Sequence, residues 1–202
     1  IAISFGERLG IAVATGKTHS CAILDNASVN CWGYNNHGQL GDGTVNSSNV
    51  PVWVDLGDNV SAVSLTAGDS HTCALTNNGT MMCWGYNSQG QLGDGTTNNS
   101  YIPVSIDFDV KRAVAISAGG EHTCALLDDA RAHCWGWNDR GQLGDGTLLS
   151  QSTPTEITTD SNVTAIATGE RHTCGLLDNS SIMCWGNNAD GQLGDNSTSN
   201  ST

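Results

Sequence analysis

Short apolar runs alternate along the chain with polar turns that are rich in glycine, asparagine and aspartate. One set of these runs occupies residues 60–66, 71–75, 81–85 and 103–108. Apolar runs of this length, bounded by turn residues, predict β-strands. No stretch combines a 3.6-residue apolar spacing with helix-capping residues. The pattern therefore predicts an all-β fold.

The same set of runs occurs four times. The first cysteine of each copy is Cys21, Cys73, Cys124 or Cys174, so the copies are spaced 52, 51 and 50 residues apart. A period of this size corresponds to one supersecondary unit per copy. We therefore predict one four-stranded antiparallel sheet per repeat, with repeat boundaries at residues 11–59, 60–110, 111–161 and 162–202.

The repeat carries a long motif. It begins with [AT]-G-x-x-H-[ST]-C-[AG]-[IL], continues with C-W-G-x-N-x-x-G-Q-L-G-D and ends with P-V-x-[VI]-x. This motif resembles the regulator of chromosome condensation repeat, also called the alpha-tubulin suppressor-like repeat, over essentially the whole chain. The resemblance implies β-propeller blades arranged around an axis. That family usually closes its ring with seven blades, so four copies imply a partial or unusual ring.

The two ends of the sequence are offset relative to the repeat. Residues 1–10 resemble the last strand of a repeat, because Ile1–Phe5 aligns with residues 52–56, whereas the fourth copy stops before such a strand. We therefore predict that Ile1–Phe5 is a terminal or donated strand that completes a blade of the fourth type. The acceptor blade is either the chain's own or that of a neighbouring chain.

Eight cysteines form four pairs, each with nine residues between its members. A hairpin centred midway, at Asp129 for one pair, would place the two cysteines opposite each other at a separation that suits a disulfide. The predicted pairs are Cys21 with Cys31, Cys73 with Cys83, Cys124 with Cys134, and Cys174 with Cys184. The alternative is buried free thiols in a reducing compartment.

Two further sets of repeated residues have metal binding as an alternative. A histidine precedes each first cysteine, but three ligands per repeat are fewer than a structural zinc site normally uses. We expect the histidines to bridge adjacent blades, as the resemblance also implies. The N-x-x-G-Q-L-G-D loop offers two or three oxygen ligands, so calcium is the alternative to a hydrogen-bonded turn. The histidines are His19, His71, His122 and His172, and the loop residues are Asn35, Asn87, Asn138, Asn188, Asp42, Asp94, Asp145 and Asp195.

A tryptophan follows the second cysteine of every repeat. We expect these side chains to fill the space between blades, with each indole N–H bonded to a carbonyl. Two residues further on, three repeats carry another aromatic residue where the fourth has Asn187, which gives either solvent-facing packing or a sugar- or peptide-binding surface. The tryptophans are Trp32, Trp84, Trp135 and Trp185, and the second aromatics are Tyr34, Tyr86 and Trp137.

The charge balance limits the classes of partner. The formal net charge is −13, with only 7 lysine and arginine residues, so no basic stripe is available for nucleic acid. No apolar run reaches the roughly 20 residues of a membrane span. The Asn-x-Ser/Thr motif makes attached glycans possible. It occurs nine times, at Asn26, Asn46, Asn59, Asn78, Asn98, Asn162, Asn179, Asn196 and Asn200.

The repeats contain no recognisable catalytic motif, such as a nucleophile elbow or a P-loop, and no cofactor is indicated. We therefore predict a non-catalytic, extracellular or cell-surface structural or adhesive protein that self-associates, as in a head-to-tail filament with disulfide-linked blades. The alternative is a protein-interaction propeller module within a longer seven-bladed protein. Such a module would act as a partner scaffold or as a nucleotide-exchange-type regulator of a small GTPase.

Overall fold

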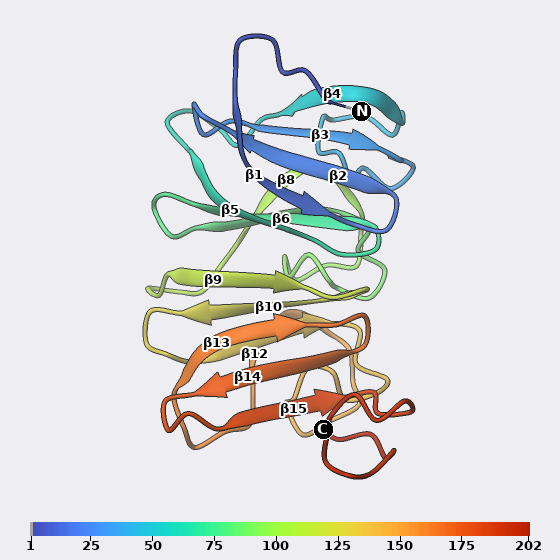
Figure 1. Ribbon diagram of the computed structural model, residues 1–202, viewed down its shortest axis with the longest axis vertical. Helices are drawn as coiled ribbons and strands as arrows, with labels where there is room; N and C mark the ends of the chain where they lie inside the picture. Colours follow the sequence, from blue (N-terminus) through green and yellow to red (C-terminus); the bar gives the residue numbers. More distant parts are fainter. Residues whose placement is uncertain (1) are drawn as a thin grey trace.

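The computed structural model describes residues 2–202, which form fifteen β-strands in four antiparallel sheets (Figure 1). We call these sheets blades 1 to 4. Blade 1 contains β1 (Gly10–Thr15), β2 (His19–Leu24), β3 (Val29–Gly33) and β4 (Ser48–Val54), and blade 2 contains β5 (Ala62–Ala67), β6 (His71–Thr76), β7 (Met81–Gly85) and β8 (Ser100–Ile106). Blade 3 contains β9 (Ala113–Ala118), β10 (His122–Leu127), β11 (Ala132–Gly136) and β12 (Gln151–Glu156), and blade 4 contains β13 (Val163–Thr168), β14 (His172–Leu177) and β15 (Ile182–Gly186).

The blades follow one another in a row, and the strands of each blade follow chain order. The first strands of successive blades contact each other, from β1 to β5, from β5 to β9 and from β9 to β13, so they lie nearest the axis. Blades 1 and 4 lie at opposite ends of the row, and the ring is open (Figure 1). The predicted all-β propeller fold is confirmed. The described residues include no helix that could cross a membrane.

The third strands of blades 1 to 3 end in a bulge that depends on glycine. In blade 2 the pairing of β7 with β8 shifts between Cys83 and Gly85. Gly85 has a φ of 106°, a conformation that residues with a Cβ atom rarely adopt. A Cβ atom built at Gly85 would lie only 2.6 Å from the Ser70 carbonyl oxygen. The C-W-G sequence therefore fixes the point at which the chain leaves the sheet.

The hydrophobic core lies between blades rather than within one. We call each interface between consecutive blades a seam. In the first seam, Cys21 and Leu40 of blade 1 form one buried cluster with Ala74 and Trp84 of blade 2. Neighbouring residues on a strand point to opposite faces, so one strand serves two seams. Burial of apolar area in the seams contributes most to holding the blades together.

The predicted N-terminal strand does not form within a single chain. Blade 4 has three strands, and an isolated bridge between Gly186 and Ser201 marks where a fourth would begin. In the segment Ile1–Phe5, Ile1 lies outside the described residues, and residues 2–5 form no strand. A strand needs a partner edge, and within the chain the hairpin of blade 4 lies at the far end of the row (Figure 1). Phe5 instead packs on Trp32, with ring centroids 5.9 Å apart.

Candidate functional site

The eight cysteines form four disulfides, one across the central hairpin of each blade. They join Cys21 to Cys31, Cys73 to Cys83, Cys124 to Cys134 and Cys174 to Cys184. In each pair the two residues occupy directly opposite positions in the ladder, with Cα atoms 4.0–4.1 Å apart. The first three disulfides are buried in the seams, whereas Cys174 and Cys184 are partly exposed. The six cysteines of blades 1 to 3 are therefore part of the structural core.

Three of the four repeated histidines bridge consecutive blades, as expected, whereas His172 makes no such contact among residues 2–202. The Nε2 atoms of His19, His71 and His122 lie 2.8, 2.9 and 2.9 Å from a threonine hydroxyl of the next blade. Burial lowers the pKa of His71 to about 3 and that of His122 to about 3. These rings are therefore neutral at physiological pH, and their geometry is that of a structural link rather than a proton-transfer group.

Hydrogen bonds within the long loops account for the repeated asparagine and aspartate. The buried Asn35 side chain donates to Asp42, and its own carbonyl oxygen accepts from the Leu40 amide. Asp42 also accepts from the amide and hydroxyl of Thr44. The other three blades repeat this arrangement. Among residues 2–202 no cluster of three or more histidine, cysteine, aspartate or glutamate side chains could hold a metal ion.

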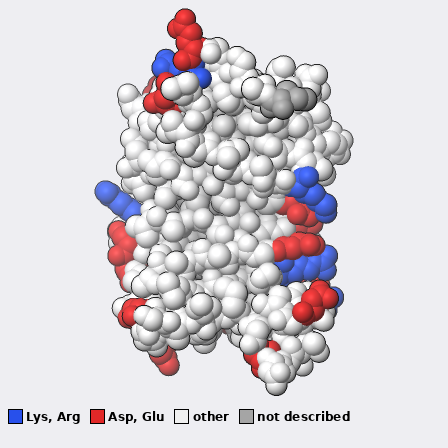
Figure 2. Space-filling model, in the orientation of Figure 1, with Lys and Arg blue, Asp and Glu red and all other residues white. Residues whose placement is uncertain are grey.

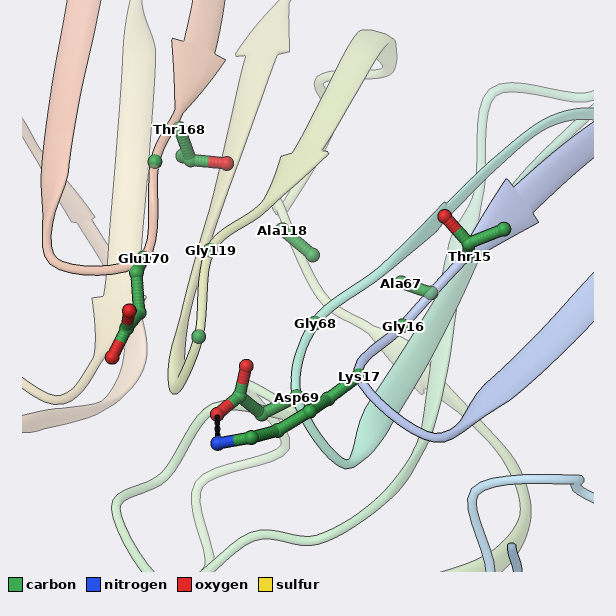
Figure 3. Close-up of a pocket in the computed structure, with 12 residues that line it drawn as sticks. Thr15, Gly16, Lys17, Ala67, Gly68, Asp69, Ala118, Gly119, Thr168 and Glu170 are labelled. Atoms are coloured by element: carbon green, nitrogen blue, oxygen red, sulfur yellow. Dashed lines mark hydrogen bonds and ion pairs between the residues drawn. The ribbon is translucent and has the colours of Figure 1, made fainter. Parts of the chain in front are cut away.

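The hollow that best fits a binding site lies where the first strands of the blades end. We call the turns at residues 16–18, 68–70, 119–121 and 169–171 the axial turns. Together with the strand ends they surround a pocket of about 430 Å³ (Figure 3). Most of its lining residues are glycine, alanine and threonine, and they come from all four blades. Small side chains leave backbone groups accessible, so the pocket can accept a protruding group of a partner.

Charged residues surround this pocket on the axial turns. Lys17 pairs with Asp69 of the next blade at 3.1 Å (Figure 3), and Arg171 lies 3.5 Å from Glu170. Partial burial, together with the nearby Asp69 carboxylate, raises the pKa of Glu121. In Figure 2 the charged residues lie along the edges of the molecule, whereas the middle of this view is uncharged.

An aromatic row flanks the axial turns. It consists of Tyr34, Tyr86 and Trp137, each at the start of the long loop of its blade. The backbone amide of Tyr34 donates to the Thr18 carbonyl, and the other blades repeat this bond. The His37 ring lies 4.8 Å from that of Tyr86, and the Arg171 guanidinium lies 4.6 Å from the Trp137 ring centre. Tyr34 lies edge-on to the same His37 ring, with centroids 6.5 Å apart, and its side chain remains exposed.

The axial turns and the aromatic row are among the positions at which the repeats differ. The G-Q-L-G motif is the same in all four blades, but the two residues after the axial glycine read KT, DS, GE and ER. The residue after C-W-G is Tyr, Tyr, Trp or Asn. The aromatic row was recognised from the sequence, but the axial turns were not. Variation inside an otherwise constant repeat is the signal that could have located them, because a constant scaffold with varied turns is typical of binding surfaces.

Comparison with known proteins supports this interpretation of the fold. The family model of the RCC1-like domain matches residues 3–202. The ultraviolet-B receptor UVR8 of Arabidopsis thaliana is 32% identical over 151 residues, which are 74% of this chain and 34% of UVR8.

Two solved structures are similar over nearly the whole chain. Human WBSCR16 has a TM-score of 0.86 at 25% identity, covering 98% of this chain and 53% of that one. Prp20p of Saccharomyces cerevisiae, described with its binding properties to Gsp1p and histones, has a TM-score of 0.80 at 25% identity, covering 95% and 49%. The chain thus spans about a third of UVR8 and about half of either structure. It belongs to the RCC1-like domain family.

Proposed function

We propose that the chain is a non-catalytic protein-interaction domain that binds its partner with the axial turns and the aromatic row. One observation carries the proposal: all four blades contribute small residues to one pocket, and charged side chains on the axial turns surround it. A catalytic site would need a nucleophile, base or metal held in reach of a substrate. The cysteines instead form disulfides, and His19, His71 and His122 form hydrogen bonds between blades.

The relatives support a protein-interaction role more than a structural or adhesive filament. The description of Prp20p names binding to Gsp1p and histones, both of which are proteins. No similar protein reported above is described as a filament or adhesion protein. The interaction module is therefore our main hypothesis, and regulation of a small GTPase is one form that it could take.

The face fits a partner segment that carries positive charge. Lys17 is held by Asp69, and Arg171 lies over Trp137, which leaves Glu121 as the carboxylate without a close cationic partner on the axial turns. The net charge of −13 attracts cationic segments over a longer range. Tyr34 is exposed and can pack against apolar or cationic side chains of the same segment.

Fluorescence anisotropy with two labelled decapeptides, one rich in lysine and one rich in glutamate, tests this proposal. We expect the lysine-rich peptide to bind more tightly, and Glu121→Gln to weaken it by roughly 2- to 5-fold, the effect of a partly exposed ion pair. Glu7→Gln removes the same charge from an exposed residue away from the face and serves as the control. Equal binding of both peptides, or equal effects of both variants, would reject the basic-partner hypothesis.

We further propose that the domain works in an oxidising compartment, at the cell surface or outside the cell, and carries N-linked glycans. Four disulfides favour such a compartment. All nine asparagines of the Asn-x-Ser/Thr motifs are exposed. The buried asparagines of the long loops, such as Asn35, lie outside these motifs. The intact mass of the protein from its native source, before and after alkylation and glycosidase treatment, tests both points, and full alkylation without reductant would contradict the first.

A further inference from the structure

One ring of the aromatic row is covered by a cation of the chain itself. The guanidinium of Arg171, on the axial turn of blade 4, lies 4.6 Å from the ring centre of Trp137 in blade 3. The face of an aromatic ring attracts a cation placed over it. The ring thus belongs to one blade, and the group beside it belongs to the axial turn of the next blade. This contact shows where a guanidinium lies when it binds to the row.

One blade earlier, the same two positions carry a ring and a carboxylate. Tyr86 of blade 2 corresponds to Trp137, and Glu121 on the axial turn of blade 3 corresponds to Arg171. A cation placed on the Tyr86 ring would therefore also meet a negative charge. We propose that Tyr86 and Glu121 bind an arginine side chain of the partner protein. This proposal rests on the proposed function and names the residue type that the face recognises.

The backbone supports this correspondence between blades. The Asp69 amide donates to the Gly120 carbonyl at 2.9 Å, and the Gly120 amide donates to the Glu170 carbonyl at 3.0 Å. These three residues occupy the same repeat position, so consecutive axial turns are joined in the same way. In every blade, the first residue of the long loop is also anchored through its amide to its own axial turn. The axial turn of blade 3 is therefore placed relative to the ring of blade 2 as the turn of blade 4 is to the ring of blade 3.

The Tyr86 ring is held in position before a partner binds. Its residue is half-buried, and the His37 ring of blade 1 lies 4.8 Å away at an interplanar angle of 54°. A tilted contact of this kind fixes a ring without the overlap of a parallel stack. A side chain that is already ordered loses less conformational entropy on binding. The aromatic half of the site is therefore preorganised.

Glu121 supplies a carboxylate that no cation neutralises directly. Among residues 2–202, no lysine, arginine or histidine forms an ion pair with Glu121. The Lys17 ammonium pairs with Asp69, and the Arg171 guanidinium lies against Glu170. Glu121 is also half-buried. Because partly buried pairs are screened less than exposed ones, an ion pair formed here keeps more of its strength in salt.

The geometry favours arginine over lysine. A guanidinium is planar, so it can lie on a ring while the N–H groups at its edge donate to a carboxylate, whereas an ammonium is a compact and strongly hydrated charge. The other two rings of the row lack this combination. Ser70 stands beside Tyr34 at the position of Glu121, and Arg171 already covers Trp137. Of the three rings, Tyr86 alone has a carboxylate at this position.

Fluorescence anisotropy with two labelled decapeptides, one rich in arginine and one with lysine at the same positions, tests the site. We expect the arginine peptide to bind about 2- to 5-fold more tightly, the size of a cation–π contact at an exposed site. Tyr86→Leu should remove this preference. Tyr34→Leu is the matched control and should keep it, because Tyr34 has no carboxylate beside it. Unfolding curves establish that each variant is folded.

Glu121→Arg is the second test and leaves the tyrosine in place. It puts a guanidinium at the position of Arg171, so it should cover the Tyr86 ring from within and also remove the preference for arginine. If the preference survives in Glu121→Arg and in folded Tyr86→Leu, the assignment to these two residues is wrong.

A third peptide, rich in glutamate, separates this site from the proposed function. If both basic peptides bind more tightly than the glutamate peptide but equally to each other, the arginine site is overturned and the basic-partner face stands. If the basic peptides have no advantage over the glutamate peptide, the proposed face is rejected and the arginine site with it.

Discussion

The internal seams and the outer sides of blades 1 and 4 are built from the same repeat positions but differ in what covers them. Trp135 is fully buried and hydrogen-bonded to the Gln91 carbonyl, whereas Trp32 is partly exposed and rests on Phe5. The ring contacts are nevertheless alike, because Phe108 lies as far from Trp135 as Phe5 lies from Trp32. The comparison shows that a blade supplies half of each contact and that stability arises when two blades meet.

This arrangement is expected of repeat proteins, in which stability is the sum of repeat and nearest-neighbour terms. Blades 2 and 3 each have two neighbours, and blades 1 and 4 each have one. A substitution in a seam should therefore lower the free energy of unfolding far more than the same substitution on the outer side of blade 1 or blade 4. The following predictions test that difference, from the largest expected effect to the smallest.

The largest difference is expected for tryptophan. We predict that Trp135→Ala lowers the free energy of unfolding by about 3–5 kcal/mol, because it removes a buried ring and leaves a cavity in the seam. Trp32→Ala should cost clearly less, since part of its ring is already in contact with solvent. Urea unfolding measures both values. Equal losses would show that contacts within each blade, and not the seams, determine the stability of the fold.

The disulfides provide a second test. Each closes a loop of about 10 residues, for which chain entropy alone predicts a contribution of about 3 kcal/mol. This contribution should be similar for all four, but their rates of reduction should differ. Cys174–Cys184 lies on the outer side of blade 4 and is open to a thiol reagent, whereas the buried Cys124–Cys134 requires the seam to open first.

We therefore expect mild reductant to open Cys174–Cys184 at least about tenfold faster than the other three, since a seam opening that costs about 1.4 kcal/mol slows attack by that factor. Alkylation at timed intervals followed by peptide mass spectrometry identifies the order. Simultaneous reduction of all four would mean that the blades unfold together before any sulfur is reached.

Much of this arrangement could be predicted from the sequence because its determinants recur locally. The C-x9-C spacing predicted the hairpin pairs, and the repeated tryptophan predicted an indole bonded between blades. The acceptor, the Gln39 carbonyl, could not be identified because it belongs to another repeat and to a loop whose path depends on the whole fold. The segment at Ile1–Phe5 was predicted as a strand, since its sequence resembles one, but strand pairing depends on which edge lies within reach.

The histidines of the seams give the smallest effect per residue. Burial lowers the pKa of His71 to about 3 from an ordinary value of 6.5, so between these pH values the unfolded chain binds the additional proton. The stabilising contribution of neutral His71 is complete above pH 6.5 and decreases as the pH falls toward 3. At pH 5 the loss is about 2 kcal/mol for this residue.

We predict that His71→Gln lowers stability at pH 7, because the link to Thr123 is changed, but reduces the further loss between pH 7 and pH 5 by about 2 kcal/mol. Thr123→Val separates the two effects, since it removes the same hydrogen-bond partner and keeps the titrating ring. It should lower stability at pH 7 and retain the full pH dependence. Urea unfolding at both pH values measures the difference, and the acidic side chains common to all three proteins cancel. If His71→Gln and Thr123→Val lose equal stability on acidification, protonation of His71 does not account for the loss of stability between pH 7 and pH 5.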